Sequence, residues 1–130
     1  MKKFRILYVV VLLSLGVLLL AACGGAKAPT EINATLTEFK IELDQNSAPA
    51  GVVRFILTNN GEVPHEFVIE PAGAMDEPFE KDGMVSEAEA IQPGDTATLE
   101  WTLEPGEYHL ACYVEGHFEG GMETTFTVTK

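Results

Sequence analysis

The sequence predicts an all-β fold, a Greek-key antiparallel β-sandwich of seven or eight strands, and three observations carry this prediction. Short apolar segments with alternating polar residues recur about every ten residues between positions 33 and 130. Turn-forming Gly, Pro, Asn and Asp residues separate them, and no segment has the period of a long amphipathic helix. A single domain of about 100 residues can bury a sufficient core without disulfides.

The first half of this domain supplies three expected strands. Apolar positions change parity near Thr37, so we expect residues 33–43 to form one strand with a bulge or bend there. Residues 52–58 are β-branched and nearly continuous in hydrophobicity, as in a strand that is buried on both sides. A third strand covers residues 65–70 and directly follows a proline, which fixes the backbone before it.

The middle of the domain is less regular. Residues 71–95 are rich in Pro and Gly, and residues 86–91 within them predict either a short helical turn or an edge strand. Met75 and Met84 lie in this segment, where we expect them to pack over the core or over the rim of a site rather than to bind metal. Residues 96–103 then alternate cleanly and predict a strand with its apolar side inward.

The last two expected strands, residues 108–113 and 122–128, flank one loop. The period of two places Cys112 and Met122 on the core-facing side, where the two strands join that loop. His109 lies on the opposite parity, so we expect it to be a solvent-facing strand residue.

This loop carries the chemistry of a copper site. Cys112, His117 and Met122 follow one another at five-residue spacing and offer a thiolate, an imidazole and a thioether. Electron-transfer copper sites use two histidines and one cysteine, with a weak axial methionine, so the loop supplies every ligand except the second histidine. For Cys112 alone, the alternative is a buried cysteine that acts as a small hydrophobic residue.

The N-terminus belongs to another class of sequence. A basic head precedes an apolar run over residues 6–20 and a small-residue exit at residues 21–23, as in an export signal. Leu20-Ala21-Ala22-Cys23 resembles the lipobox of bacterial lipoproteins, in which cleavage occurs before the cysteine and the sulfur receives a diacylglycerol. Two acyl chains give stable anchoring. The alternative is an uncleaved transmembrane anchor, since residues 6–22 are just long enough to span a bilayer of about 30 Å.

We therefore predict a signal peptide over residues 1–22 with a lipobox ending at Cys23, a flexible tether over residues 23–32, and one folded domain over residues 33–130. The domain would be exported and held on the outer or periplasmic face of the cell membrane. Without the signal segment, five basic residues stand against twenty acidic ones. Such a surface excludes nucleic acid and would steer basic redox proteins towards it, although the acidity also serves solubility.

Taken together, these motifs resemble the cupredoxins, the small blue copper proteins that include plastocyanin, azurin and auracyanin. The resemblance rests on Pro64-His65 after Asn-Asn-Gly and on the ordered Cys112, Gly116-His117 and Gly121-Met122 before a final strand, and it covers residues 33–130. It implies that His65, Cys112 and His117 are the equatorial ligands and Met122 the axial ligand of one copper ion per chain, cycling between Cu(I) and Cu(II).

Two residues depart from the pattern of this family. Glu66 stands where plastocyanin and azurin often have an asparagine that braces the ligand loop by hydrogen bonds. Glu115 stands where relatives with a Cys-x-x-Pro-Gly-His loop have proline, which predicts a looser and more negative loop.

The resemblance implies an electron carrier and not an enzyme, because four protein ligands leave no open position for a substrate. We expect a monomer that docks to redox proteins at the membrane. A second hypothesis is copper trafficking or sequestration, in which Met75 and Met84 join the soft ligands around Cu(I). A third is a metal-free domain of this fold that is kept for structure or interaction.

Overall fold

The structure is a computed structural model, and it describes Gly25 and residues 27–130. The predicted signal segment and Cys23 lie outside the described residues. Across the described part of the chain the backbone forms strands, turns and bends and contains no helix, so no helix there could span a membrane.

Eleven strands are present in the described residues, more than the seven or eight expected, because one expected strand is divided in two and three short strands lie outside the expected strands. Their bounds are β1 Thr30–Thr37, β2 Lys40–Leu43, β3 Ser47–Pro49, β4 Gly51–Asn59, β5 His65–Pro71, β6 Glu80–Lys81, β7 Met84–Val85, β8 Glu87–Ile91, β9 Thr96–Leu103, β10 Gly106–Ala111 and β11 Glu123–Thr129.

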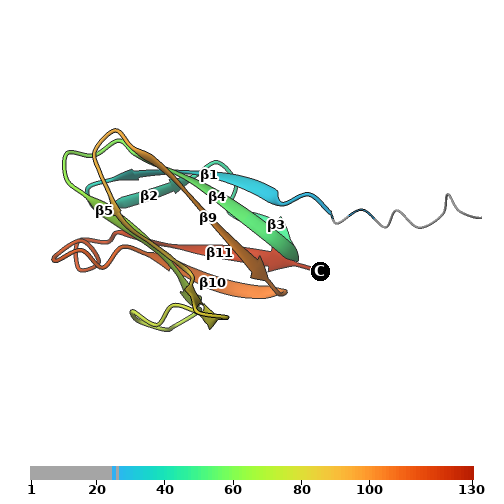
Figure 1. Cartoon of the computed structure of the whole chain (residues 1–130). Helices are drawn as coiled ribbons and strands as arrows, with labels where there is room; N and C mark the ends of the chain where they lie inside the picture. Colours follow the sequence, from blue (N-terminus) through green and yellow to red (C-terminus); the bar gives the residue numbers. More distant parts are fainter. Residues whose placement is uncertain (1–24, 26) are drawn as a thin grey trace, which may run out of the picture.

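The strands form two packed sheets and a small hairpin. One sheet has the order β2-β1-β4-β9, the other has the order β3-β11-β10-β5-β8, and β6 pairs only with β7. The chain crosses from one sheet to the other between β2 and β3, β3 and β4, β4 and β5, β8 and β9, and β9 and β10. The predicted all-β sandwich is confirmed; most pairs are antiparallel, and β1 with β4 and β3 with β11 are parallel. Figure 1 shows the two layers, with β1, β2, β4 and β9 above β10 and β11.

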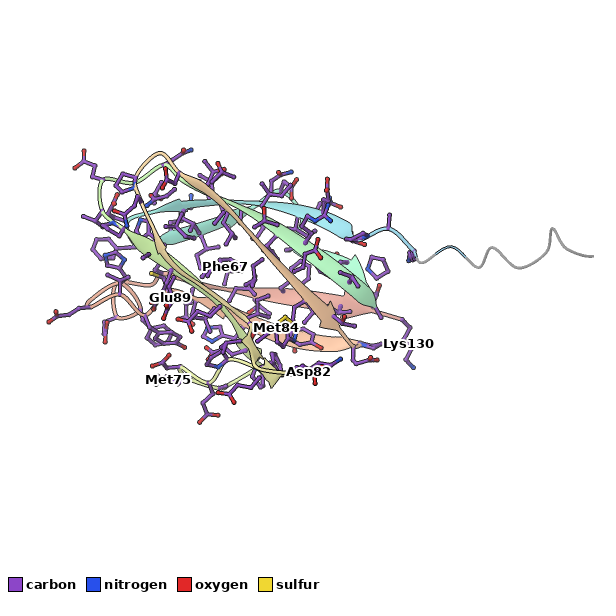
Figure 2. All side chains as sticks on the ribbon, in the orientation of Figure 1. Phe67, Met75, Asp82, Met84, Glu89 and Lys130 are labelled. Atoms are coloured by element: carbon purple, nitrogen blue, oxygen red, sulfur yellow. The ribbon has the colours of Figure 1, made fainter. Side chains whose placement is uncertain are left out.

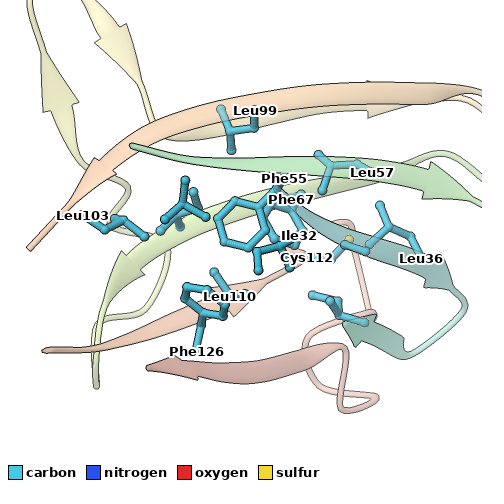
Figure 3. Packing of buried hydrophobic residues seen from close by; sticks show 14 of the residues in the cluster. Ile32, Leu36, Phe55, Leu57, Phe67, Leu99, Leu103, Leu110, Cys112 and Phe126 are labelled. Atoms are coloured by element: carbon cyan, nitrogen blue, oxygen red, sulfur yellow. The ribbon is translucent and has the colours of Figure 1, made fainter. Parts of the chain in front are cut away.

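The core lies between the layers and is built from the inward side chains of both sheets. Phe55 of β4 contacts Phe67 of β5 and Phe126 of β11, each with ring centroids 5.2 Å apart. All three rings are fully buried, and each contributes about 1.5–3 kcal/mol of transfer free energy. Cys112 belongs to the same cluster, as Figure 3 shows.

Three local predictions are resolved or corrected by the structure. Residues 33–43 do not form one bulged strand: β1 and β2 form a hairpin that turns at Glu38-Phe39, and this turn causes the change of parity. The strand at residues 52–58 is buried on alternate positions and not on both sides, because its outer residues are half-exposed or exposed. Residues 86–91 contain the edge strand β8 and no helical turn.

This topology gathers the predicted ligand residues at one end of the second sheet. β5 begins at His65, β10 ends one residue before Cys112, and β11 begins one residue after Met122. Because β5, β10 and β11 are neighbours in that sheet, these three strand ends meet. The loop that connects β10 to β11 lies at the left of Figure 1, away from the C-terminus.

Candidate metal centre

Three of the predicted ligand residues come together in the structure. His65, Cys112 and His117 each offer a ligand atom, and these atoms all lie within 4.8 Å of one another. We call these three residues the ligand cluster. His65 and Cys112 are fully buried, and His117 is 8% exposed. A thiol and two imidazoles are the soft and borderline donors that suit copper, and this set matches the trigonal arrangement of electron-transfer copper sites.

The facing atoms of the ligand cluster are the Nδ1 atoms and the sulfur. His65 Nδ1 lies 3.2 Å from His117 Nδ1, and Cys112 Sγ lies 3.6 Å from His117 Nδ1 and 4.0 Å from His65 Nδ1. Three lone-pair donors thus point at one buried spot. Such a spot fits a cation, because a cation would pair with all three lone pairs at once.

Backbone hydrogen bonds fold the ligand loop without the proline found in some relatives. Met122 N–H donates to His117 O at 3.0 Å, and Cys112 N–H donates to Met122 O at 3.1 Å. The N–H of His117 donates to Val114 O at 2.8 Å, which makes the turn that contains the exposed Glu115. Met122 is fully buried in the same core cluster as Cys112. The loop therefore holds Met122 beside the ligand cluster, and its role as axial ligand stays a prediction.

Burial shifts the pKa values of His65 and Cys112. Burial, and then the nearby His117, lower the pKa of His65, so the imidazole stays neutral with a free lone pair. Burial also raises the pKa of the Cys112 thiol, whereas the backbone amides of Glu66 and Val114 act in the opposite direction. A bound metal ion deprotonates a coordinating thiol, so the buried sulfur becomes a thiolate when a cation enters.

Glu66 braces the ligand loop in spite of the departure from asparagine. Its carboxylate accepts a hydrogen bond from the Tyr113 N–H, which links the residue after His65 to the residue after Cys112. Burial is the largest cause that raises the pKa of Glu66, with the nearby Asp76 and Glu89 adding to it. The bracing contact is therefore present, with a carboxylate in the place of an amide.

Two residues of the β1–β2 turn approach the histidines from outside. Glu38 Oε1 lies 3.5 Å from His65 Nε2, and the Phe39 ring meets the His117 ring edge-on with centroids 5.7 Å apart. Backbone amides of Glu38 itself and of Glu62 are the largest causes that lower the pKa of Glu38. No local pattern in the sequence indicates Glu38, because it precedes His65 by 27 positions and only the fold brings the two together.

A second buried polar group lies on the other face of β5 and β10. The carboxylate of Glu70 is fully buried and accepts hydrogen bonds from His109 Nδ1 at 2.8 Å, from Tyr113 Oη, and from Glu77 N–H at 2.8 Å. His109 Nε2 contacts a carboxylate oxygen of Glu123. We call Glu70, His109, Tyr113 and Glu123 the carboxylate cluster.

The prediction of a solvent-facing His109 is therefore wrong. Its parity is as expected, but its side chain is only 14% exposed, because Phe118 and Glu123 cover that face of the strand. Both ring nitrogens meet carboxylate oxygens, of Glu70 and of Glu123. Glu70 lies directly opposite His109 in the β5–β10 register, and an acidic residue opposite a histidine is the signal that could have predicted this pair.

Met75 and Met84 do not pack over the core. The two residues are 65% and 60% exposed, and Figure 2 shows Met75 at the lower edge of the molecule. Met84 borders a shallow hollow with Trp101 and Val52. Val52 pairs with Thr102, at the end of β4 opposite to Asn59, so this hollow lies away from the ligand cluster.

Comparisons with known sequences agree with this geometry. A family described as the cupredoxin-like domain matches residues 9–124. The copper-resistant cuproprotein CopI of Vibrio cholerae serotype O1 is 28% identical over 109 residues, which cover 75% of this chain and 64% of that protein. The CopI protein of Rubrivivax gelatinosus is 27% identical over 78 residues, which cover 54% of this chain and 47% of that protein. The chain thus matches less than two thirds of the length of these relatives.

Solved structures show the same fold. A dithionite-reduced auracyanin from Roseiflexus castenholzii has a TM-score of 0.56 at 23% identity, with 82% of this chain and 100% of that chain covered. Auracyanin B has a TM-score of 0.61 at 21% identity, with 80% and 92% covered. Reduced rusticyanin has a TM-score of 0.57 at 18% identity, with 79% and 82% covered. At these identities the likeness supports the architecture of the sandwich.

Proposed function

Because the chain belongs to the cupredoxin-like family, we propose that it is an electron-transfer blue copper protein that holds one copper ion through His65, Cys112, His117 and Met122. The observation that carries the proposal is the ligand cluster: two imidazoles and a thiol, all buried, with ligand atoms within 4.8 Å of one another. The copper ion would supply one-electron exchange between Cu(I) and Cu(II).

The residues around the site serve this exchange in different ways. His65 is fixed at the start of β5, and the ligand loop is closed by its own hydrogen bonds, so the donor atoms have little freedom to rearrange. Donor atoms that move little favour fast electron transfer, because the site then needs little reorganisation when the charge of the copper ion changes. His117 is the most exposed residue of the ligand cluster, with the Phe39 ring against its edge, and we assign it as the port for electrons.

The proposal includes a place and a class of partner. The acidic surface favours basic redox proteins, and a lipid on Cys23 would hold the domain at the outer or periplasmic face of a membrane. We infer a monomeric carrier and not an enzyme, because four protein ligands would leave no open position for a substrate.

Labelled fatty acid should enter the wild-type chain and should be absent from Cys23→Ala; labelling of both would contradict lipidation at this residue.

The test of the copper site is a titration of the purified apo-domain with Cu(II). The proposal predicts an intense visible absorption from thiolate-to-copper charge transfer, which Cys112→Ser abolishes while the fold is kept. A Cys112→Ser domain that gives the same absorption as the wild type would contradict the assignment.

A second candidate function is copper handling in resistance, and the names of the CopI relatives favour it. The exposed thioethers of Met75 and Met84 are soft donors that could capture Cu(I) and pass it on. The discriminating measurement is Cu(I) affinity in the double variant Met75→Leu, Met84→Leu. A colourless protein that binds only Cu(I), and that loses affinity in this variant, would support handling over electron transfer.

A further inference from the structure

One tight turn touches both histidines of the ligand cluster. β1 and β2 pair up to Thr37 and Lys40, so Glu38 and Phe39 alone form the turn between them. Glu38 Oε1 lies 3.5 Å from His65 Nε2, and the Phe39 ring lies edge-on to His117 at 5.7 Å between centroids. The turn therefore reaches the two imidazoles from outside the cluster.

The Glu38 carboxylate is held by the same segment that carries His65. Its Oε1 accepts hydrogen bonds from the N–H of Glu62 at 2.7 Å and from the N–H of Val63 at 3.2 Å. Because these amides precede His65 by two and three residues, they fix the carboxylate relative to the imidazole ring.

Two glycines leave the room that this turn needs. A Cβ on Gly61 would collide with Glu38 Oε1 and would lie 2.7 Å from His65 Nε2. A Cβ on Gly120 would collide with the Phe39 ring, whose edge would lie 2.7 Å away at Cε1. Phe39 itself has a φ of 64°, in the left-handed region that non-glycine residues occupy only when their surroundings hold them there. The packing is thus specific to this turn and these two glycines.

The second ring nitrogen of His65 makes no hydrogen bond within the described residues, although Glu38 Oε1 lies 3.5 Å from it. Nδ1 is the atom that faces the ligand cluster, so a metal on Nδ1 leaves the proton of the neutral ring on Nε2. Nε2 is buried and has no hydrogen-bond partner among the described residues. Metal-bound histidines almost always donate their other N–H to a carboxylate, a carbonyl or water.

We propose that Glu38 is the positioning residue of His65. In the metal-loaded protein, His65 Nε2–H donates to Glu38 Oε1, and this hydrogen bond fixes the ring plane and raises the basicity of Nδ1. The carboxylate charge also favours the more positive state of the metal and so lowers the reduction potential. The inference rests on the proposed copper site and assigns a role to a residue outside its four ligands.

Zn(II) affinity of the full-length protein tests the positioning, since Zn(II) binds imidazole and thiolate donors and needs no redox activity. Glu38→Ala should weaken Zn(II) binding about 10–100-fold, the usual loss for removal of such a partner. Glu38→Gln keeps an acceptor oxygen in place and should restore binding to within about threefold of wild type, well inside that loss. Wild-type affinity in Glu38→Ala would overturn the proposal.

The charge effect has its own readout and a matched control. In the copper-loaded protein, Glu38→Gln should raise the potential by about 59 mV, which corresponds to a tenfold change in the ratio of Cu(II) to Cu(I) affinity. Glu62→Gln removes one charge from an exposed side chain in the segment before His65, and it should shift the potential by less than half as much. Equal shifts in the two variants would overturn the assignment of Glu38.

An NMR signal separates this proposal from the proposed function. In the Zn(II)-loaded wild type, the Nε2–H proton of His65 should exchange slowly and resonate downfield, and Glu38→Ala should abolish this signal. A signal that is unchanged in Glu38→Ala would contradict the hydrogen bond. Failure of the proposed function would be seen instead in the wild type, as a copper-loaded protein without visible absorption or a reversible couple.

Discussion

The ligand cluster and the carboxylate cluster both draw residues from β5 and from β10 or the segment just after it, but they differ in how their polar atoms are satisfied. In the carboxylate cluster, donors and acceptors alternate: Tyr113, His109 and a backbone amide donate to Glu70, and His109 also meets Glu123. In the ligand cluster, three lone-pair donors face one another, and His65 Nε2 has no partner in the described residues. One group is complete within itself, whereas the other fits an added cation.

The difference shows that residue type alone does not identify a metal site. His65 and His109 are both largely buried and both belong to strands of the same sheet. A histidine between two carboxylates is held as a hydrogen-bond donor, and a histidine that faces a thiol and another imidazole offers its lone pair. The chemistry of the nearest neighbours therefore separates a structural histidine from a ligand.

The largest expected effect comes from replacing one histidine of each cluster. His65→Ala should lower copper affinity more than 100-fold, since loss of a ligand exceeds the roughly 10–100-fold cost of losing an outer partner. His109→Ala should leave copper affinity within about threefold, because it removes none of the facing donors. Competition with a chelator of known affinity measures both, and equal losses would erase the distinction between the clusters.

Replacing the buried carboxylate of Glu70 should have the opposite effect, a loss of stability with the copper site retained. Glu70→Ala leaves the Tyr113 hydroxyl and the Glu77 amide without their acceptor, so we expect a loss of about 2–3 kcal/mol in the free energy of unfolding. Visible absorption of the copper-loaded protein should be retained. Urea unfolding of the apo-domain provides the measurement, and a stability equal to wild type would show that the carboxylate cluster adds nothing to the fold.

A smaller effect is expected from removing one hydroxyl. Tyr113→Phe deletes the hydrogen bond to Glu70 and keeps the ring that stacks on Phe118, so it should cost about 1–2 kcal/mol. Tyr108→Phe deletes an exposed hydrogen bond to the Glu104 carbonyl and should cost less than about 0.5 kcal/mol. Similar costs for the two variants would argue against a special contribution from the buried partner.

The smallest effect concerns alkaline pH. Burial, followed by the hydrogen bond to Glu70, raises the pKa of Tyr113. The unfolded chain therefore loses this proton first, and the stability that it contributes is complete below a pH of about 10 and declines above it. Urea midpoints of the apo-domain on either side of that pH should fall more in wild type than in Tyr113→Phe. Identical declines would assign the pH dependence to other groups.

Much of the fold was predictable, because alternate side chains of a strand face the core and the period of two in the sequence therefore indicates which side chains are buried. The parity of Cys112 and Met122 placed both inward, and both are fully buried. The change of parity near Thr37 was ambiguous, since a bulge and a tight turn produce the same pattern in sequence. The left-handed backbone of Phe39 shows that the change of parity is a turn.

The surroundings of the site were less accessible from sequence, because they depend on contacts between distant segments. Alternation placed His109 on the outer face, but it carries no information about what covers that face. Glu38 approaches His65 only because the β1–β2 turn meets the segment around Gly61. Met75 and Met84 lie in a segment without periodicity, and nothing in their local sequence indicated that they point to solvent.

The measurement that tests the central claim most directly is voltammetry of the copper-loaded protein, read together with its visible spectrum. We predict one reversible one-electron couple with one copper per chain, and an intense thiolate-to-copper band that bleaches on reduction and returns on oxidation. A colourless protein that binds only Cu(I) and shows no reversible couple would contradict the claim that the ligand cluster is an electron-transfer copper site.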